Sequence, residues 1–416
     1  MRILLISPNR YVTPPVPPIG LEYLAASLLA KGHDPVILDL CFSENPYDEI
    51  DAAINSRRPD VAGITVRNVD TVLYHTNEFF LDQIGEIVGY LKNMHALPVM
   101  IGGAGLASNP RGILEYLKAD CAIKGPAETT VHDMLREFSE GTAQGKVFQG
   151  IYSHSGTCLR NPQALNYRKY FEAGGIAGFE THKGCSSSCV YCLEANTPVR
   201  FKEIDDVIRE IKSLVDVGYD HFHLCDSEFN EDNEYAIEFC SALKKAGLGI
   251  RWALYMKPVY SSKSLFRLLK ESGAYLITLT VDSWKKCPLY WEDYERCVYG
   301  AKAHGINIAV DFLTGFPYET EADLREHLEI LRRPLPDSIG INTYIRLYKT
   351  LKITNVIRND PGLRRNLFGA IDDASFVKPV FYNQIDTETL KRLISGDPLF
   401  RIEGIEKGVN YARLRN

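Results

Sequence analysis

The sequence predicts an α/β protein with a flavodoxin-like (Rossmann-type) amino-terminal domain, a partial (β/α)6 barrel and a short carboxy-terminal extension. Short apolar runs alternate with amphipathic stretches in two separate series, as expected for buried parallel strands joined by helices. A stretch of low periodicity, residues 146–175, separates the two series. We therefore expect domains at 1–145 and 176–346, joined by a linker at 146–175. The extension, 347–416, has too few apolar residues to form its own core and should pack on the barrel.

The first series predicts a doubly wound parallel sheet. Its strand candidates are Ile3–Ser7, Pro35–Leu40, Val61–Val66, Pro98–Gly102 and Cys121–Lys124. Sheets of this kind bind ligands beyond the carboxyl ends of their strands. The loop that follows the first strand is long and rich in proline, which suits a binding loop better than a tight turn.

The second series predicts fewer strands than the eight of a complete barrel. Its strand candidates are Gly178–His182, His221–Cys225, Ile250–Tyr255, Leu276–Val281, Asn307–Phe312 and Gly340–Ile345. Barrel active sites lie at the carboxyl ends of the strands, so polar residues that follow these runs are the candidates for chemistry.

Composition narrows the class of protein. The net charge is -6 and no basic stripe stands out, so a nucleic-acid partner is not expected. No apolar run approaches the ~20 residues that a membrane span needs, and the first residues do not resemble a signal peptide. We expect a cytoplasmic protein that acts on a small molecule. In a reducing compartment its 10 cysteines should be metal ligands, catalytic thiols or core residues.

Three cysteines fall on one short loop after the first strand of the second series. Cys185, Cys189 and Cys192 have the spacing C-x3-C-x2-C. Thiolates are the usual ligands of iron–sulfur clusters, and a [4Fe–4S] cluster normally takes four of them. Because no fourth cysteine is nearby, one iron would stay open to a small molecule. A zinc site is the alternative, but structural zinc prefers four ligands in paired spacing.

This motif, with the aromatic Tyr191 before the last cysteine, resembles that of the radical S-adenosylmethionine (SAM) superfamily. The resemblance implies that the open iron binds the amino and carboxylate groups of SAM. One electron from the cluster, supplied by a flavodoxin- or ferredoxin-type reductant, would then release a 5′-deoxyadenosyl radical. It also implies that Tyr191 lies by the adenine.

Further SAM contacts are implied at the ends of later strands. Asp226 and Glu228 would lie near the methionine amino group, although the usual Gly-Gly-Glu is absent there. Asp282 and Ser283 would lie near the ribose. Gly315 begins a segment similar to Gly-Leu-Pro-Gly-Glu-Thr. For each of these residues the alternative is a helix cap or a turn.

The amino-terminal sheet resembles that of the cobalamin-binding branch of the same superfamily. The matching segments are Pro17–Leu21, Gly63–Thr65, Ile101–Gly103 and Gly125–Glu128. The implied cobalamin contacts are Pro18, Thr65, Arg67, Asn68, Gly102, Gly103, Gly125 and Glu128. The Asp-x-His-x-x-Gly motif, which supplies a lower axial histidine in many cobalamin enzymes, is absent. Arg67 and Asn68 follow the third predicted strand, where the resemblance places the lower corrin face; pairing of Arg67 with Asp70 or a phosphate is the alternative.

Four more polar residues are candidates for substrate contacts or bases. His221 and His223 alternate along one predicted strand, so both side chains point to one face. Tyr344 and Arg346 lie near the end of the last predicted strand. For all four, a packing role is the alternative.

The resemblance implies cobalamin-dependent methyl transfer to an unactivated carbon or a phosphorus of a small molecule. Two alternatives stay open because SAM placement decides which bond breaks: transfer of the 3-amino-3-carboxypropyl group, and a radical cyclisation or rearrangement. A regulator that senses SAM or cobalamin is the non-enzymatic alternative, but a sensor does not need a cluster with an open iron.

Overall fold

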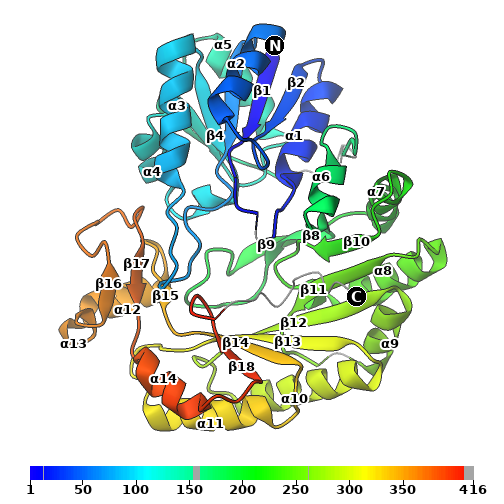
Figure 1. The fold of residues 1–416 in the computed structure, drawn as a ribbon, viewed down its shortest axis with the longest axis vertical. Helices are drawn as coiled ribbons and strands as arrows, with labels where there is room; N and C mark the ends of the chain where they lie inside the picture. The colour runs from blue at the N-terminus through cyan, green and yellow to red at the C-terminus, as the bar shows by residue number, and fades with distance from the viewer. Residues whose placement is uncertain (13, 153–159, 261, 407–416) are drawn as a thin grey trace. The chain divides into compact units, whose positions relative to one another are not determined.

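The computed structural model describes residues 1–12, 14–152, 160–260 and 262–406. The chain divides into two compact units (Figure 1). The first comprises Met1–Thr71 and Glu78–Gly178, and the second comprises Val72–Asn77 and the chain from Phe179 onward. Within the described ranges no helix is long and apolar enough to cross a membrane.

The first unit is built on a six-stranded sheet in the order β2-β1-β3-β4-β5-β6. All of its strands pair in parallel. They are β1 (Arg2–Ser7), β2 (Asp34–Asp39), β3 (Val61–Thr65), β4 (Val99–Gly102), β5 (Cys121–Lys124) and β6 (Val147–Gln149). The strand order reverses between β1 and β3, which confirms the predicted flavodoxin-like sheet and places its switch point there.

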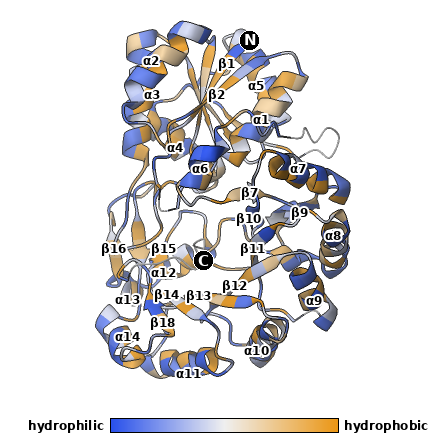
Figure 2. Ribbon diagram, turned by 45° about the vertical axis from the view of Figure 1, so that its right-hand side comes forward, coloured by the Kyte–Doolittle hydropathy of each residue, from blue (hydrophilic) through white to orange (hydrophobic). Residues whose placement is uncertain are grey.

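Helices flank this sheet and bury its apolar strands. They are α1 (Ile19–Ala30), α2 (Pro46–Arg57), α3 (Leu81–His95), the short η1 (Ala104–Ala107), α4 (Pro110–Leu117) and α5 (Thr130–Ser139). Ile3, Leu5 and Leu28 are among the fully buried residues of the resulting core. Figure 2 shows the apolar strands of this sheet between helices that carry both apolar and hydrophilic residues.

The stretch 146–175, predicted as a linker, contains regular structure. It supplies β6, the edge strand of the sheet, and α6 (Tyr167–Glu172) in the first unit. The buried Arg160 side chain donates to Glu22 Oε2 at 3.2 Å and to the Gly178 carbonyl at 2.7 Å. These hydrogen bonds and the burial of Arg160 fix this stretch on the first unit. The sequence does not reveal this, because its apolar runs are short here.

The second unit is built on a seven-stranded sheet in the order β18-β14-β13-β12-β11-β10-β7. The strands from β10 to β18 pair in parallel. They are β7 (Ala177–Phe179), β10 (His221–Leu224), β11 (Arg251–Met256), β12 (Ala274–Asp282), β13 (Asn307–Leu313), β14 (Ser338–Asn342) and β18 (Phe400–Ile402). This confirms the predicted partial barrel and adds a seventh strand from the carboxy-terminal part of the chain.

Helices cover the outer face of this sheet (Figure 1). They are α7 (Ile204–Asp216), α8 (Asn233–Ala246), α9 (Lys263–Glu271), α10 (Pro288–Ala303) and α11 (Glu321–Arg332). The carboxy-terminal region adds α12 (Lys352–Asn359), α13 (Pro361–Arg364) and α14 (Thr387–Ile394).

The sixth predicted strand, Gly340–Ile345, ends earlier than expected. β14 stops at Asn342, whose side-chain oxygen accepts a hydrogen bond from the Tyr344 backbone at 3.0 Å and turns the chain. The next residues form β15 (Ile345–Arg346), in a small antiparallel sheet with β17 (Val380–Tyr382) and β16 (Leu367–Gly369). Tyr344 therefore lies beyond the end of the barrel strand, and Arg346, expected near that end, lies on β15.

Candidate active site

The three motif cysteines lie on a β-hairpin. β8 (His182–Cys185) pairs antiparallel with β9 (Thr197–Phe201), and the loop between them carries Cys189 and Cys192. Gly184 has a φ of 90°, and a Cβ there would lie 2.2 Å from a backbone oxygen of β9. Only glycine fits this position, so the tight approach of the two strands depends on it.

The three thiols influence one another. Burial raises the pKa of Cys189, and the charges of Asp282 and Cys192 raise it further. Burial also raises the pKa of Cys192, with a contribution from Cys185. No three His, Cys, Asp or Glu side chains in the described part of the chain converge on a single metal ion. The three thiols nevertheless lie close enough to interact, as three ligands of one cluster must.

A buried ion pair holds the start of this loop. The carboxylate of Glu231 accepts hydrogen bonds from the Ser186 hydroxyl at 2.6 Å and from the Ser186 backbone N–H at 3.2 Å. Lys257 Nζ lies 3.0 Å from the same carboxylate and 3.2 Å from Ser186 Oγ. Burial would raise the pKa of Glu231, but the hydrogen bonds from Ser186 and Lys257 outweigh it and lower that pKa.

Asp226 holds the turn that leads into the hairpin. It accepts hydrogen bonds from the Thr181 backbone at 2.8 Å and from the Thr181 hydroxyl, and it lies 3.1 Å from His182 Nδ1. The side chains of Asp226 and His182 are fully buried. Both carboxylate oxygens are thus engaged by the protein, which makes Asp226 a positioning residue for the hairpin.

Glu228 and Asp282 differ from Asp226, because each keeps one buried carboxylate oxygen without a hydrogen-bond partner. The other oxygen of Glu228 accepts from the Thr280 hydroxyl, and the other oxygen of Asp282 accepts from the Tyr191 hydroxyl at 3.1 Å. Burial raises the pKa of Glu228 to about 8 and also raises the pKa of Asp282. Buried acceptors without partners are costly and are typical of a site that takes a polar ligand.

Tyr191 and Ser283 join this region to neighbouring elements. The Tyr191 ring packs on Phe316, with centroids 5.6 Å apart. The backbone N–H of Ile353, in α12, donates to Val190 in the cysteine loop at 3.3 Å. The buried Ser283 hydroxyl lies 3.4 Å from that of Thr314 and links the ends of β12 and β13. The carboxy-terminal region therefore packs on the cysteine loop.

The segment after β13 is organised by Glu319, which the sequence reasoning did not single out. Its buried carboxylate accepts from the Thr314 hydroxyl at 2.7 Å and from the backbone N–H groups of Gly315 and Phe316 at 2.6 and 3.0 Å. Gly315 has a φ of 84°, and a Cβ would lie 2.3 Å from the backbone of the next loop. Local packing thus requires glycine at position 315. Glu319 fixes the loop that begins there.

Tyr318 occupies the place of the second glycine in the similar segment of the family. Its φ of 66° lies in the left-handed region, which glycine adopts freely and tyrosine does not. The exposed side chain donates a hydrogen bond to Asp360 at 2.8 Å. The backbone requirement explains the family's glycine, and the bond to Asp360 partly offsets the strain in this chain.

The two histidines of β10 lie on the face of the strand opposite to the helices. Phe222 and Leu224, which alternate with them, are fully buried. The ring of His223 contacts Tyr255 with centroids 5.7 Å apart, and His221 pairs with Asp220 at 2.6 Å. The shared face predicted for His221 and His223 is confirmed; a substrate role stays a prediction.

Tyr344 and Arg346 have packing roles in the second unit. The Tyr344 ring stacks on Tyr74 with centroids 4.1 Å apart. Arg346 is buried and donates to the backbone carbonyls of Leu347 at 2.6 Å and Val377 at 3.2 Å. These contacts hold the small antiparallel sheet; a substrate role for either side chain stays a prediction.

At the carboxyl edge of the first sheet, Arg67, Asn68 and Gly125 are exposed. Most of the other predicted cobalamin contacts are half-buried there: Thr65, Gly102, Gly103 and Glu128. A Cβ on Gly103 would lie 2.6 Å from the Val66 carbonyl, so this glycine serves the packing of two strand ends. Pro18 is buried, and its carbonyl accepts from Leu21 in α1 at 2.9 Å. The exposed positions leave the edge accessible to a large ligand.

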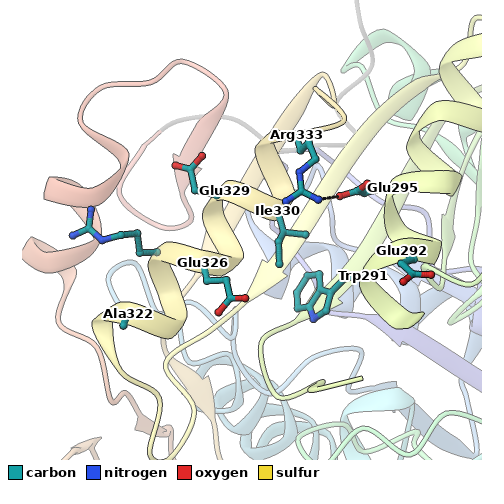
Figure 3. Close-up of a pocket in the computed structure, with 9 residues that line it drawn as sticks. Trp291, Glu292, Glu295, Ala322, Glu326, Glu329, Ile330 and Arg333 are labelled. Atoms are coloured by element: carbon teal, nitrogen blue, oxygen red, sulfur yellow. Dashed lines mark hydrogen bonds and ion pairs between the residues drawn. The ribbon is translucent and has the colours of Figure 1, made fainter. Parts of the chain in front are cut away.

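A pocket of about 540 Å³ lies on the outer surface between α10 and α11 (Figure 3). Trp291 and Ile330 contribute its apolar lining, while Glu295 and Arg333 pair across it at 2.6 Å. None of the site residues predicted from the sequence lines this pocket. Its carboxylates are on the helical shell, away from the strand ends, and it is not the candidate site.

Comparisons with known proteins agree with the division of the chain into two units. The B12 binding domain model matches residues 9–135, and the radical SAM superfamily model matches residues 179–331. Tryptophan 2-C-methyltransferase from Streptomyces laurentii is 22% identical, over 83% of this chain and 72% of its own length. Cytidylyl-2-hydroxyethylphosphonate methyltransferase from Streptomyces wedmorensis is 24% identical, over 72% of this chain and 69% of its own.

Solved structures share the fold. The radical SAM methyltransferase TsrM from Kitasatospora setae, with cobalamin and a [4Fe–4S] cluster bound, is 21% identical with a TM-score of 0.82 over 96% of this chain and 92% of that chain. The cobalamin-dependent radical enzyme OxsB, with aqua-cobalamin and SAM bound, has a TM-score of 0.70 at 14% identity, over 95% of this chain and 66% of that chain. In this chain a B12 binding domain therefore precedes a radical SAM domain.

Proposed function

We propose that this chain is a cobalamin-dependent radical SAM methyltransferase that methylates an unactivated carbon or a phosphorus of a small molecule. The observation that carries the proposal is the set of two buried carboxylates, Glu228 and Asp282, each with an unpartnered oxygen, in the same unit as the cysteine hairpin. Support comes from the two matched domains and from relatives that are named for methyl transfer.

The cofactors are a [4Fe–4S] cluster, SAM and cobalamin. Cys185, Cys189 and Cys192 would hold the cluster, which supplies one-electron chemistry when bound. Glu228 is the better candidate for the SAM amino group, because one of its oxygens is unpartnered whereas both oxygens of Asp226 are engaged. Asp282 offers a second acceptor, suited to a ribose hydroxyl, and the Tyr191 hydroxyl orients its carboxylate.

Cobalamin would lie at the carboxyl edge of the first sheet. Thr65, Gly102, Gly103, Gly125 and Glu128 would provide small or polar contacts along that edge, with Pro18 shaping the first loop. Arg67 would lie at the lower corrin face with Asn68 beside it. A guanidinium stays protonated and has no lone pair to offer cobalt, so Arg67 would keep this face free of a protein ligand.

The proposal also covers the substrate contacts, the reductant, the cellular compartment and the domains. His221 and His223 remain candidates for contact with the small-molecule substrate, since both lie on the inner face of β10. A flavodoxin- or ferredoxin-type reductant would supply electrons in the cytoplasm, and neither nucleic acid nor a membrane is needed. Cobalamin would be held by the first unit, which reaches Gly178 and so includes the stretch 146–175. The barrel would begin at Phe179, with residues 347–406 packed on it.

The products of anaerobic turnover test this proposal. S-adenosylhomocysteine together with 5′-deoxyadenosine is expected when SAM serves both as methyl donor and as radical source. Methylthioadenosine would instead indicate aminocarboxypropyl transfer. 5′-deoxyadenosine without S-adenosylhomocysteine would indicate a cyclisation or rearrangement, and either of these outcomes would overturn methyl transfer.

A further inference from the structure

We propose that Glu231 and Lys257 form a charged clamp that orders the cysteine loop and sets the reduction potential of the cluster. The proposal rests on the assignment of the cluster to Cys185, Cys189 and Cys192. Neither clamp residue belongs to the cysteine motif: Glu231 ends η2 (Phe229–Glu231), after β10, and Lys257 follows β11. Both therefore reach the loop from other strands of the barrel.

The Glu231 carboxylate is saturated by the protein. It accepts from the Ser186 hydroxyl at 2.6 Å and the Ser186 backbone at 3.2 Å, and Lys257 Nζ lies 3.0 Å away. It also lies within hydrogen-bonding reach of the Cys185 thiol. A carboxylate with this many donors is poorly placed to become an iron ligand. It acts through Ser186, the residue that follows the first cluster cysteine, and is a positioning residue.

The burial of the pair makes its charges effective. The Glu231 side chain is 1% exposed and the Lys257 side chain 17% exposed, so water screens them weakly. A cluster that gains an electron becomes more negative. The Glu231 charge opposes that gain, and the Lys257 charge favours it. In the wild type the two largely cancel at the cluster, while their mutual attraction keeps Ser186 and Cys185 in place.

Removing one charge at a time should shift the potential in opposite directions. Glu231→Gln keeps the shape and most hydrogen bonds but leaves Lys257 uncompensated, so reduction becomes easier. Lys257→Met leaves Glu231 uncompensated, so reduction becomes harder. At a fixed potential the ratio of reduced to oxidised cluster should change by at least about threefold in each direction; tenfold corresponds to 59 mV for one electron.

The experiment is an EPR-monitored redox titration of the full chain after anaerobic reconstitution, with iron and sulfide content measured for each variant. The matched control is the exposed pair Lys244 and Glu271, also 3.0 Å apart. Lys244→Met and Glu271→Gln should leave the potential unchanged. Lys257→Arg should restore the wild-type value, and the double variant Glu231→Gln/Lys257→Met should return close to it.

The outcomes separate this proposal from the one on which it rests. A wild type without a four-iron cluster overturns both. A wild type with a full cluster, and variants that keep it at an unchanged potential, overturns the clamp alone. Loss of cluster in both variants, with Lys257→Arg also unable to restore it, would reduce the pair to a support for folding and overturn its electrostatic role.

Discussion

The hydroxyl of Tyr191 donates a hydrogen bond to the carboxylate of Asp282 at 3.1 Å and thereby joins the cysteine loop to the carboxyl end of β12. Tyr191 stands directly before Cys192 in the sequence, and Asp282 retains one buried oxygen without a partner. A displacement of the loop would therefore move the proposed ribose acceptor as well. This hydrogen bond therefore couples the position of the proposed cluster site to that of the proposed SAM site.

Asp282→Asn should weaken SAM binding about tenfold while the cluster content stays unchanged, since a charge-assisted hydrogen bond is worth roughly 1.5–3 kcal/mol. Equilibrium dialysis with labelled SAM and iron analysis measure the two quantities. Tyr294→Phe is the control, because it removes another buried tyrosine hydrogen bond, to Leu331 at 2.8 Å, far along the chain from the loop. Equal SAM affinity in wild type and Asp282→Asn would refute the role of Asp282.

Glu228 should make SAM affinity depend on pH. Its pKa of about 8 in the protein without ligand means that the group is mostly neutral at pH 7, while the N–H groups of the SAM amino group and the positive charge of the SAM sulfonium favour the carboxylate. Binding then releases a proton below pH 8, and affinity should rise from pH 6 to pH 8. Glu228→Gln should bind SAM more weakly at pH 8 and lose most of this dependence. Calorimetry in buffers of different ionisation enthalpy detects the proton; no release would contradict the assignment.

Glu228 should make stability change with pH in the direction opposite to SAM affinity, so that stability falls as pH rises. The folded-state pKa of Glu228 is raised from 4.5 to about 8, so the folded protein holds a proton that the unfolded chain releases. This contribution is fully present below pH 4.5 and is lost as pH rises through about 8. Without SAM, the thermal midpoint of the wild type should fall more steeply over this window than that of Glu228→Gln. Parallel curves for the two proteins would contradict the raised pKa.

Tyr318→Gly should raise the thermal midpoint, because glycine adopts the left-handed φ of 66° without strain. Tyr318→Phe separates the two effects: it keeps the strain and removes the bond to Asp360, so its midpoint should fall below that of the wild type. By contrast, Glu319→Gln should destabilise the protein by roughly 1–3 kcal/mol, since the buried carboxylate accepts three hydrogen bonds. A Tyr318→Gly variant less stable than the wild type would contradict the claim that the backbone strain at residue 318 outweighs the bond to Asp360.

Strands could be predicted from the sequence where their apolar runs are long enough to stand out from the flanking loops. β1 and β5 lie close to their predicted limits, whereas β6 and β18 are three residues each and carry no such signal. The cysteine spacing identified the loop but not the β8–β9 hairpin that presents it. Glu231 and Lys257 were missed because only the paired strands bring them to Ser186. The end of the sixth strand was placed too late because a turn at Asn342, not hydrophobicity, ends β14.

The central claim is that the two matched domains work together in methyl transfer. The direct test loads the full chain with a [4Fe–4S] cluster and cob(I)alamin and adds SAM with a deuterated methyl group under anaerobic conditions. The account predicts protein-bound cobalamin carrying the deuterated methyl group and S-adenosylhomocysteine in equal amount. A separate sample loaded with cob(II)alamin should give an EPR spectrum without splitting from a protein nitrogen, as expected for Arg67 at the lower face. A protein that binds no corrinoid, or binds it and leaves the methyl group on SAM, would contradict the account.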